Sequence, residues 1–200
     1  MKIDVMVFDG FDELDALGPL EVLRTGRDMG VDVVASLVTL DGAAMVTGSH
    51  GVRLLVDGPP DENAELVIVP GGGWSDRAAQ GAWAQGQLGA LPDFLAARHS
   101  AGVTVAGVCT GTMLLATAGL TTGRSAITHH TAISDLEANG AIVRRARVVD
   151  DGDVLTAGGV TSGLDLALWI LERHWGSDIA EAVSQEIEYS RKGDIWRRDA

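Results

Sequence analysis

The only cysteine of this chain, Cys109, stands in a setting suited to nucleophilic chemistry. The apolar run Val103–Val108 precedes it, and a pattern typical of a helix begins directly after it. Gly107 and Gly111 lie two residues before and two residues after it, which is the spacing of a nucleophile elbow, where small residues let the backbone turn sharply. A helix start also favours a thiolate. An inert, buried cysteine is the alternative, but the two glycines favour a nucleophile.

A glycine run offers backbone groups that could face a reacting molecule. Pro70 ends an apolar run and is followed by three glycines. We expect Gly72 and Gly73 to let the backbone approach a ligand closely, and one of the amides here, with that of Thr110, to stabilise a developing negative charge. A flexible loop is the alternative. The sequence contains neither a dinucleotide-binding nor a Walker-type glycine motif.

Acid–base groups follow two other predicted strands. Asp15 lies just ahead of a helix predicted to start near Pro19, where an acid can also serve only as a charge partner for the helix dipole. His129 and His130 end a short predicted strand. Adjacent strand residues point to opposite faces, and no further ligands at metal spacing accompany them, so we predict no metal site. We expect a histidine here to orient substrate or tune the thiol.

The elements that must position these residues follow an alternating pattern. Short apolar, β-branched runs alternate with stretches of helical periodicity, which predicts an α/β fold with a mostly parallel sheet and helices on both faces. Ligands bind such sheets beyond the carboxyl ends of the strands, where the candidate residues lie. The predicted strands are 3–8, 31–40, 52–58, 65–70, 103–108 and 125–128, with a hairpin over 142–156. The predicted helices are 19–29, 88–99, 110–118, 131–139, 162–175 and 178–191.

Length, charge and cysteine content restrict the class of protein. Two hundred residues, 46% of them hydrophobic, predict a single globular domain over residues 1–200. A net charge of −13 disfavours nucleic acid and anionic membranes as partners. A single cysteine excludes an internal disulfide and fits a reducing compartment. There is no apolar run of membrane-span length, and the acidic N-terminal segment lacks a signal-peptide core, so we expect a cytoplasmic protein.

Several segments, in order, resemble the ThiJ/PfpI superfamily of the class I glutamine amidotransferase-like fold. They are residues 3–8, D-A-L-G-P-L-E-V, V-I-V-P-G-G, A-G-V-C-T-G, I-T-H-H and T-A-G-G-V-T-S-G, and the resemblance extends from residue 3 to about residue 190. The C-T-G elbow with D-x-x-G-P is most similar to the isocyanide hydratases of that superfamily. The resemblance implies a flavodoxin-like three-layer sandwich, a homodimer, a small-molecule substrate, and no metal or organic cofactor.

The resemblance also implies roles for individual residues. Cys109 would be the nucleophile, Asp15 the acid beside it, Thr110 a hydrogen-bonding neighbour, Gly72 and Gly73 the facing backbone, and His129 a histidine near the sulfur. His130 departs from the usual aromatic residue or proline. The late His174 lacks the glutamate that glutaminase members need, and Thr110 replaces the histidine of protease-like members. Both activities are therefore disfavoured.

The implied reaction is cysteine-dependent hydration of an isocyanide to an N-substituted formamide through a thioimidate. Two alternatives stay open. One is a glyoxalase-like activity on another small electrophile, although such relatives usually carry glutamate where Asp15 stands. The other is a non-enzymatic ligand or redox sensor, because the fold also serves as the sensor domain of AraC-type regulators.

Overall fold

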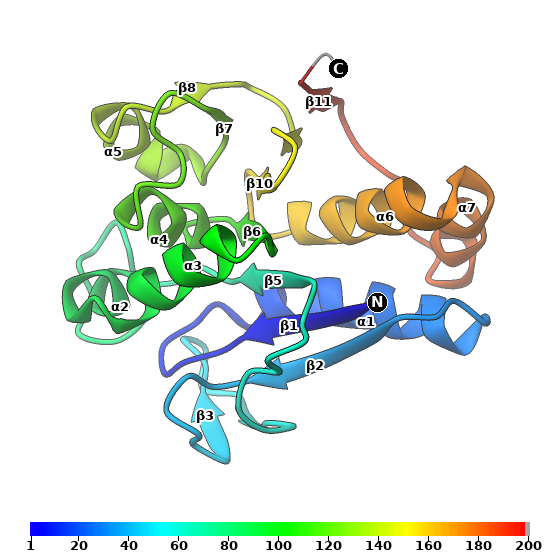
Figure 1. Ribbon diagram of the computed structural model, residues 1–200, viewed down its shortest axis with the longest axis horizontal. Coiled ribbons are helices and arrows are strands. Elements are labelled where there is room, and N and C mark those ends of the chain that lie inside the picture. Colours follow the sequence, from blue (N-terminus) through cyan, green and yellow to red (C-terminus); the bar gives the residue numbers. More distant parts are fainter. Residues whose placement is uncertain (199–200) are drawn as a thin grey trace.

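A seven-stranded sheet forms the centre of the protein, whose computed structural model describes residues 1–198 (Figure 1). The strand order is β11-β9-β10-β6-β5-β1-β2. The strands are β1 (Lys2–Met6), β2 (Val34–Val38), β5 (Leu66–Val69), β6 (Thr104–Val108), β9 (Val148–Asp150), β10 (Val154–Ala157) and β11 (Ile195–Arg197). The five strands from β2 to β10 are parallel, and β9 runs antiparallel to β10. The parallel strands have the flavodoxin-like order, so their carboxyl ends share one edge of the sheet.

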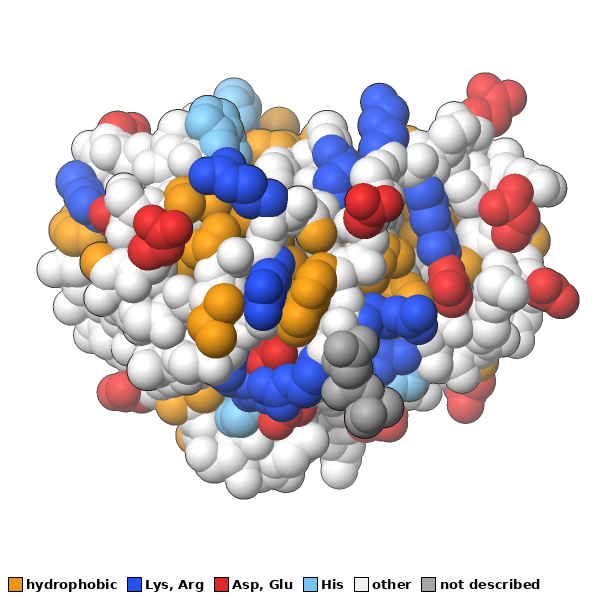
Figure 2. All heavy atoms as spheres, turned by 90° about the horizontal axis from the view of Figure 1, so that it is seen from above, with side chains coloured by type: hydrophobic (Ala, Val, Ile, Leu, Met, Phe, Trp, Pro, Cys, Tyr) orange, Lys and Arg blue, Asp and Glu red, His pale blue; other side chains and the backbone are white. Residues whose placement is uncertain are grey.

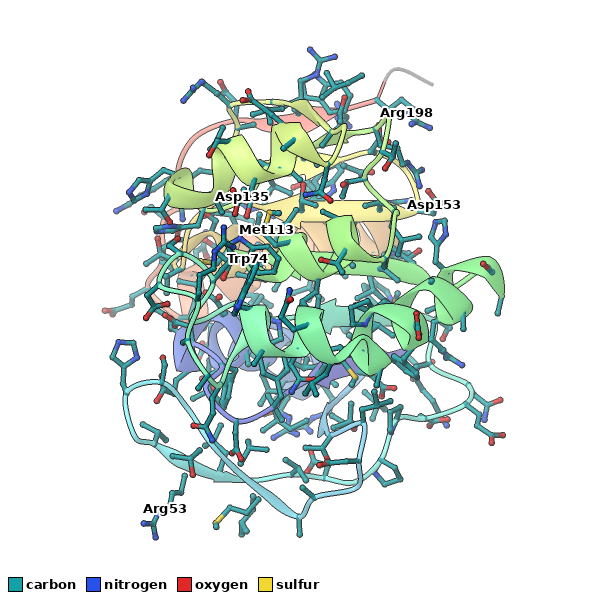
Figure 3. The ribbon with its side chains drawn as sticks, turned by 90° about the vertical axis from the view of Figure 1, so that its left-hand side faces the viewer. Arg53, Trp74, Met113, Asp135, Asp153 and Arg198 are labelled. Carbon is teal, nitrogen blue, oxygen red and sulfur yellow. The ribbon has the colours of Figure 1, made fainter. Side chains whose placement is uncertain are left out.

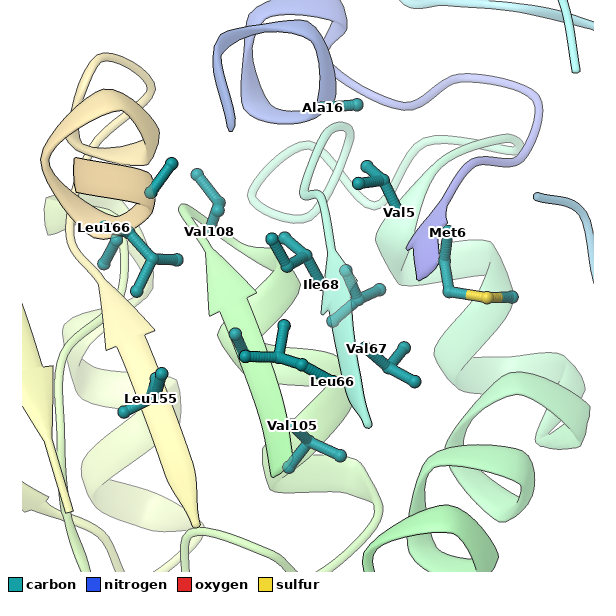
Figure 4. Close-up of a cluster of buried hydrophobic side chains, with 14 of the residues drawn as sticks. Val5, Met6, Ala16, Leu66, Val67, Ile68, Val105, Val108, Leu155 and Leu166 are labelled. Atoms are coloured by element: carbon teal, nitrogen blue, oxygen red, sulfur yellow. The ribbon is translucent and has the colours of Figure 1, made fainter. Parts of the chain in front are cut away.

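Two groups of helices complete the predicted three-layer sandwich. One group contains α1 (Glu13–Asp28), α6 (Ser162–Trp175) and α7 (Ser177–Glu186); the other contains α2 (Ala82–Leu88), α3 (Ala90–Ser100) and α4 (Gly111–Thr117). Figure 4 shows buried side chains of β1, β5, β6 and β10 on both faces of the sheet, with Ala16 of α1 and Leu166 of α6 next to those on one face. The continuous apolar runs of the sequence are therefore strands covered on both faces.

Helix α1 begins six residues earlier than the sequence predicts. Asp12 is its N-cap, and its side chain accepts a hydrogen bond from the Leu14 N–H at 3.2 Å. Pro19, predicted near the first turn, lies inside the helix and cannot donate to the Asp15 carbonyl. A Cβ at Gly163 of α6 would lie 3.1 Å from the Pro19 ring, so the proline sits where α1 and α6 pack closely. Asp15 is consequently in the first turn of α1 and not ahead of it.

Other differences from the predicted elements have local causes. Residues 53–55 form β4 (Arg53–Leu55), which pairs with an unpredicted β3 (Met45–Thr47) outside the main sheet. The predicted helix over 88–99 is divided at Gly89, whose φ is 81°. The predicted 178–191 helix ends at Glu186, ahead of a turn with φ of 50° at Glu188.

The segment between β6 and β9 forms a small unit of its own. Strand β7 (Ser125–Ala126) pairs with β8 (Ile142–Val143) in a separate two-stranded sheet, so the predicted hairpin reduces to β9 and β10. A 3₁₀ helix, η1 (His130–Ala132), and α5 (Ile133–Ala138) connect β7 to β8.

The C-terminal strand β11 lies in a charged tail and pairs with β9. Arg198 beyond it reaches the buried carboxylate of Asp151 at 2.6 Å, and Arg124 contacts the same carboxylate at 2.9 Å. Trp196 lies under the Arg144 guanidinium, 4.9 Å from the ring centroid. Lys and Arg side chains accordingly gather on this face despite the net negative charge (Figure 2). Within residues 1–198, no helix has the length and apolar character needed to span a membrane.

Candidate active site

Cys109 lies on a sharp turn between β6 and α4. Its φ is 55°, which a non-glycine residue adopts rarely and usually only where the surroundings enforce it. A Cβ at Gly107 would lie 2.7 Å from the Thr112 backbone, and one at Gly111 would lie 2.1 Å from the Val69 carbonyl oxygen. The turn therefore requires glycine on both sides of the cysteine, and it has the geometry of the predicted nucleophile elbow.

Replacing Gly111 by alanine is expected to destabilise the protein by about 3 kcal/mol or more, because the added methyl group would overlap the β5 backbone. Thermal unfolding of the purified variant measures this. Gly86→Ala in α2 is the matched control, since a Cβ there makes only an ordinary contact with Trp74 at 3.4 Å. Equal unfolding temperatures for the two variants would contradict the close approach.

Asp15 is fully buried beside Cys109. The Gly71 N–H donates to its Oδ2 at 2.8 Å, whereas Oδ1 has no hydrogen-bond partner among the described residues. Burial, and then the charge of Asp12, raise the pKa of Asp15 well above its usual value, while the Gly71 N–H and the neighbouring Cys109 thiol oppose the rise. The structure therefore brings together the two side chains that the sequence placed after different strands.

The Cys109 thiol is coupled to this carboxyl group. Burial raises the pKa of Cys109 most, and the negative charge of Asp15 raises it further; the Thr110 N–H at the helix start lowers it. The expected stabilisation of the thiolate by the helix start is present but is outweighed by burial. Because both pKa values are raised, the thiol and the carboxyl group each favour their protonated forms.

The glycine run contacts the elbow directly. The Gly72 N–H donates to Thr110 Oγ1 at 3.0 Å, and a Cβ at Gly71 would lie 2.4 Å from that same oxygen. The amides of Gly71 and Gly72 are thus bonded to Asp15 and Thr110, and they hold these side chains in place. The Gly71 and Gly72 amides are therefore not free for the role predicted for one amide in this run, that of binding a negative charge. Gly73, with φ of 64°, continues the turn and accepts from the Ala78 N–H at 3.0 Å.

His129 lies half-buried in the segment that follows β7. The preceding Thr128 hydroxyl donates to the Cys109 carbonyl at 2.9 Å, which ties this segment to the elbow. The Asp12 charge influences the pKa of His129, Asp15 and Cys109 alike, as expected for groups around one site. Burial, followed by the neighbouring His130, lowers the pKa of His129. His130 is exposed, with its ring centroid 4.2 Å from that of His129.

The loop after the glycine run is fastened to α5 by contacts that the sequence did not indicate. Trp74 is buried, and its Nε1 donates to Asp135 at 2.8 Å. Arg77 donates to the same carboxylate oxygen at 3.1 Å and lies 3.9 Å from the Trp83 ring centroid. Trp74 and Asp135 are both labelled in Figure 3. Trp74 therefore anchors the loop.

Asp12, Glu13 and His50 place potential metal-ligating atoms within 4.8 Å of one another. The Glu13 carboxylate already accepts from the His50 and Val52 N–H groups at 2.9 and 3.2 Å, and His50 Nδ1 lies 2.8 Å from it. These bonds use both of its oxygens, so the cluster fastens the loop around His50 to the start of α1.

Sequence comparison assigns the protein to a family. The model of the DJ-1/PfpI family matches residues 1–173. The chain belongs to the DJ-1/PfpI family. Within this family it is 32% identical over 193 residues to an isonitrile hydratase from Pseudomonas putida, covering 95% of this chain and 79% of that protein. The predicted ThiJ/PfpI resemblance is thereby confirmed.

Other DJ-1/PfpI relatives show how widely the fold is used. A crystal structure of a ThiJ/PfpI family protein from Pseudomonas syringae superposes with a TM-score of 0.80 at 26% identity, covering 96% of this chain and 76% of that one. The HTH-type transcriptional regulator CdhR from Pseudomonas aeruginosa is 27% identical over 93% of this chain, which spans only 54% of the regulator. The relatives thus include an enzyme and a regulator, so family membership alone does not distinguish these two functions, and the residues of the site are needed to do so.

Proposed function

We propose that this protein is a cysteine-dependent hydratase that converts isocyanides to N-substituted formamides. The observation that carries the proposal is the buried Cys109–Asp15 pair on a nucleophile elbow, in a chain 32% identical to an isonitrile hydratase. An isocyanide carbon must be both attacked and protonated, and a thiol beside a carboxyl group of raised pKa supplies both functions.

The first half-reaction forms a carbon–sulfur bond. The Cys109 sulfur attacks the isocyanide carbon, and the proton of the pair is delivered through Asp15 to that same carbon. The product is a thioimidate, R–N=CH–S–Cys109. No net charge is created in the buried site, because the proton lost by the thiol ends on the substrate.

The second half-reaction consumes water. Asp15 accepts a proton from the water as the water oxygen adds to the thioimidate carbon, and it passes that proton to the nitrogen, which gives the tetrahedral R–NH–CH(OH)–S–Cys109. The carbon–sulfur bond then breaks as the proton of the new hydroxyl group passes to the sulfur, and the N-substituted formamide leaves. Asp15 alternates between acid and base, which a pKa raised towards the working pH favours. The chemistry described uses only this chain's own groups and water.

The surroundings of the pair favour an uncharged substrate. Asp12 and Glu13 lie at the start of α1, one turn or less from Asp15, and the whole chain is acidic. An anionic substrate would be repelled, whereas an isocyanide is neutral. A glyoxalase-like reaction on a neutral aldehyde meets the same condition and is the second candidate. A ligand or redox sensor is the third, supported by the regulator among the relatives.

We also propose that the protein works as a homodimer in the cytoplasm. The dimer is supported by exposed apolar side chains on the β3–β4 pair and α2, where Met45, Leu55 and Leu88 are 50%, 78% and 72% exposed. The single free thiol fits a reducing compartment. Light scattering is expected to give twice the chain mass of 20.9 kDa; the mass of one chain at micromolar concentration would contradict the dimer.

The reaction class is tested by product formation. The protein is incubated with n-butyl isocyanide and, separately, with methylglyoxal, and the formamide and lactate are quantified by proton NMR. We expect formamide in proportion to enzyme and little lactate. Lactate alone would support the glyoxalase-like alternative, and the absence of both products would favour a sensor.

A further inference from the structure

Among residues 1–198, the His129 ring has hydrogen-bond partners at only one of its nitrogens. Its Nδ1 caps η1 by accepting from the Thr131 N–H at 3.4 Å, and it lies 2.8 Å from the Thr131 hydroxyl. A nitrogen that accepts from an amide cannot carry a proton itself, so the neutral ring carries its proton on Nε2. The Nε2–H group is thereby left for a ligand.

A second hydroxyl extends this contact into a relay. Ser75 Oγ lies 2.6 Å from Thr131 Oγ1. Because Nδ1 accepts, the Thr131 hydroxyl donates to it, and the Ser75 hydroxyl in turn donates to Thr131. Hydroxyl chains aligned in one direction reinforce each other. The relay joins the loop after the glycine run to the segment after β7. The elbow is bonded by Gly72 of the glycine run, which precedes this loop, and by Thr128 of the segment after β7.

Both ends of the relay are fixed by buried residues. Trp74, next to Ser75, is anchored to Asp135, and Thr128, next to His129, donates to the Cys109 carbonyl. Ser75 and Thr131 themselves are exposed. Their hydroxyls contribute little to the core, so they can be removed without opening a cavity. This arrangement fits a role in orienting the imidazole.

We propose that Ser75 and Thr131 are positioning residues that hold His129 as an Nε2–H donor to the nitrogen of the thioimidate on Cys109. The proposal rests on the proposed hydratase function and extends it. In the thioimidate, R–N=CH–S–Cys109, a hydrogen bond to nitrogen withdraws electrons from the carbon and accelerates the addition of water. The sulfur attacks the isocyanide before the hydrogen bond from His129 to the thioimidate nitrogen can form. Only the second half-reaction therefore depends on the relay.

Thr131→Val tests the relay, and Thr131→Ser is its conservative rescue. In the valine variant only the amide contact at 3.4 Å remains, and it holds the ring more weakly than the 2.8 Å hydroxyl contact that the substitution removes. Nitrogen-15 NMR of the imidazole is expected to show a single Nε2–H tautomer in the wild type and Thr131→Ser, and averaged nitrogen shifts in Thr131→Val. With n-butyl isocyanide, formamide release by Thr131→Val should slow about ten-fold, the loss expected for one hydrogen bond. Adduct formation on Cys109 should keep its rate, so the thioimidate accumulates.

Ser75→Ala should give the same pattern with a smaller effect, because it removes the outer member of the relay. An Nδ1–H tautomer in the wild type, or Thr131→Val with unchanged tautomer and turnover, would overturn the proposal. The NMR measurement needs no substrate. If the wild type makes no formamide, the hydratase function and the assigned role of the relay both fail, while the tautomer still decides whether the relay orients the ring.

Discussion

Cys109→Ser is expected to form formamide on the order of 10⁴-fold more slowly than the wild type, or not measurably. The serine hydroxyl is a far weaker acid and nucleophile than the thiol, and the Asp15 carboxyl beside it cannot generate an alkoxide. The substitution is nearly isosteric at a position only 6% exposed, so the fold and the elbow are retained.

The unfolding temperature of Cys109→Ser serves as the control for this result. It should match the wild type within a few degrees, because one buried sulfur is replaced by a smaller polar atom. A folded serine variant that keeps a tenth or more of the formamide activity would show that another group attacks the isocyanide.

Asp15→Asn is expected to slow turnover by about 10²- to 10⁴-fold, the range for loss of a general acid–base group. The amide can still accept the Gly71 N–H but cannot deliver or accept a proton. At the same time the thiol should become easier to ionise, since the Asp15 charge raises the pKa of Cys109. Alkylation of the variant by iodoacetamide at pH 8 should therefore be faster than that of the wild type, while formamide formation is slower.

Asp12→Asn is the matched control for Asp15→Asn. It removes a nearby negative charge, and asparagine is an equally good helix N-cap, so α1 keeps its start. We expect turnover within about ten-fold of the wild type, because only electrostatics change. An Asp15→Asn variant no slower than Asp12→Asn would show that Asp15 acts only through its charge.

The elbow could be predicted from the sequence because its requirements are local. Backbone atoms of Thr112 and Val69 leave no room for a Cβ at Gly107 and Gly111, respectively. The site therefore requires glycine at a fixed spacing on either side of the cysteine, and this spacing can be recognised in the sequence. The buried strands were predicted for the same reason, since both of their faces must be apolar. That Asp15 lies beside Cys109, and that the histidine near the sulfur is His129, followed only from the family resemblance.

Features that depend on tertiary packing could not be predicted. Pro19 suggested a helix start, yet its packing against α6 keeps it inside α1 and moves Asp15 into the first turn. The Gly71 amide bonds Asp15 across 56 residues, and Ser75 meets Thr131 across an equal separation. Contacts between residues so far apart produce no hydrophobic periodicity or motif spacing from which a single sequence could predict them. Strand β11 was missed because it is short and lies in a charged tail, and because its pairing with β9 and the contact of the following Arg198 with Asp151 depend on tertiary packing.

The most direct test of covalent catalysis at Cys109 is a rapid-quench experiment with a carbon-13-labelled alkyl isocyanide. Intact-protein mass spectrometry and peptide mapping would follow the first turnover. The proposed mechanism predicts an adduct of exactly one isocyanide on Cys109, forming before formamide appears and decaying as formamide is released. Formamide produced without any adduct on Cys109, at a rate that Cys109→Ser shares, would contradict it.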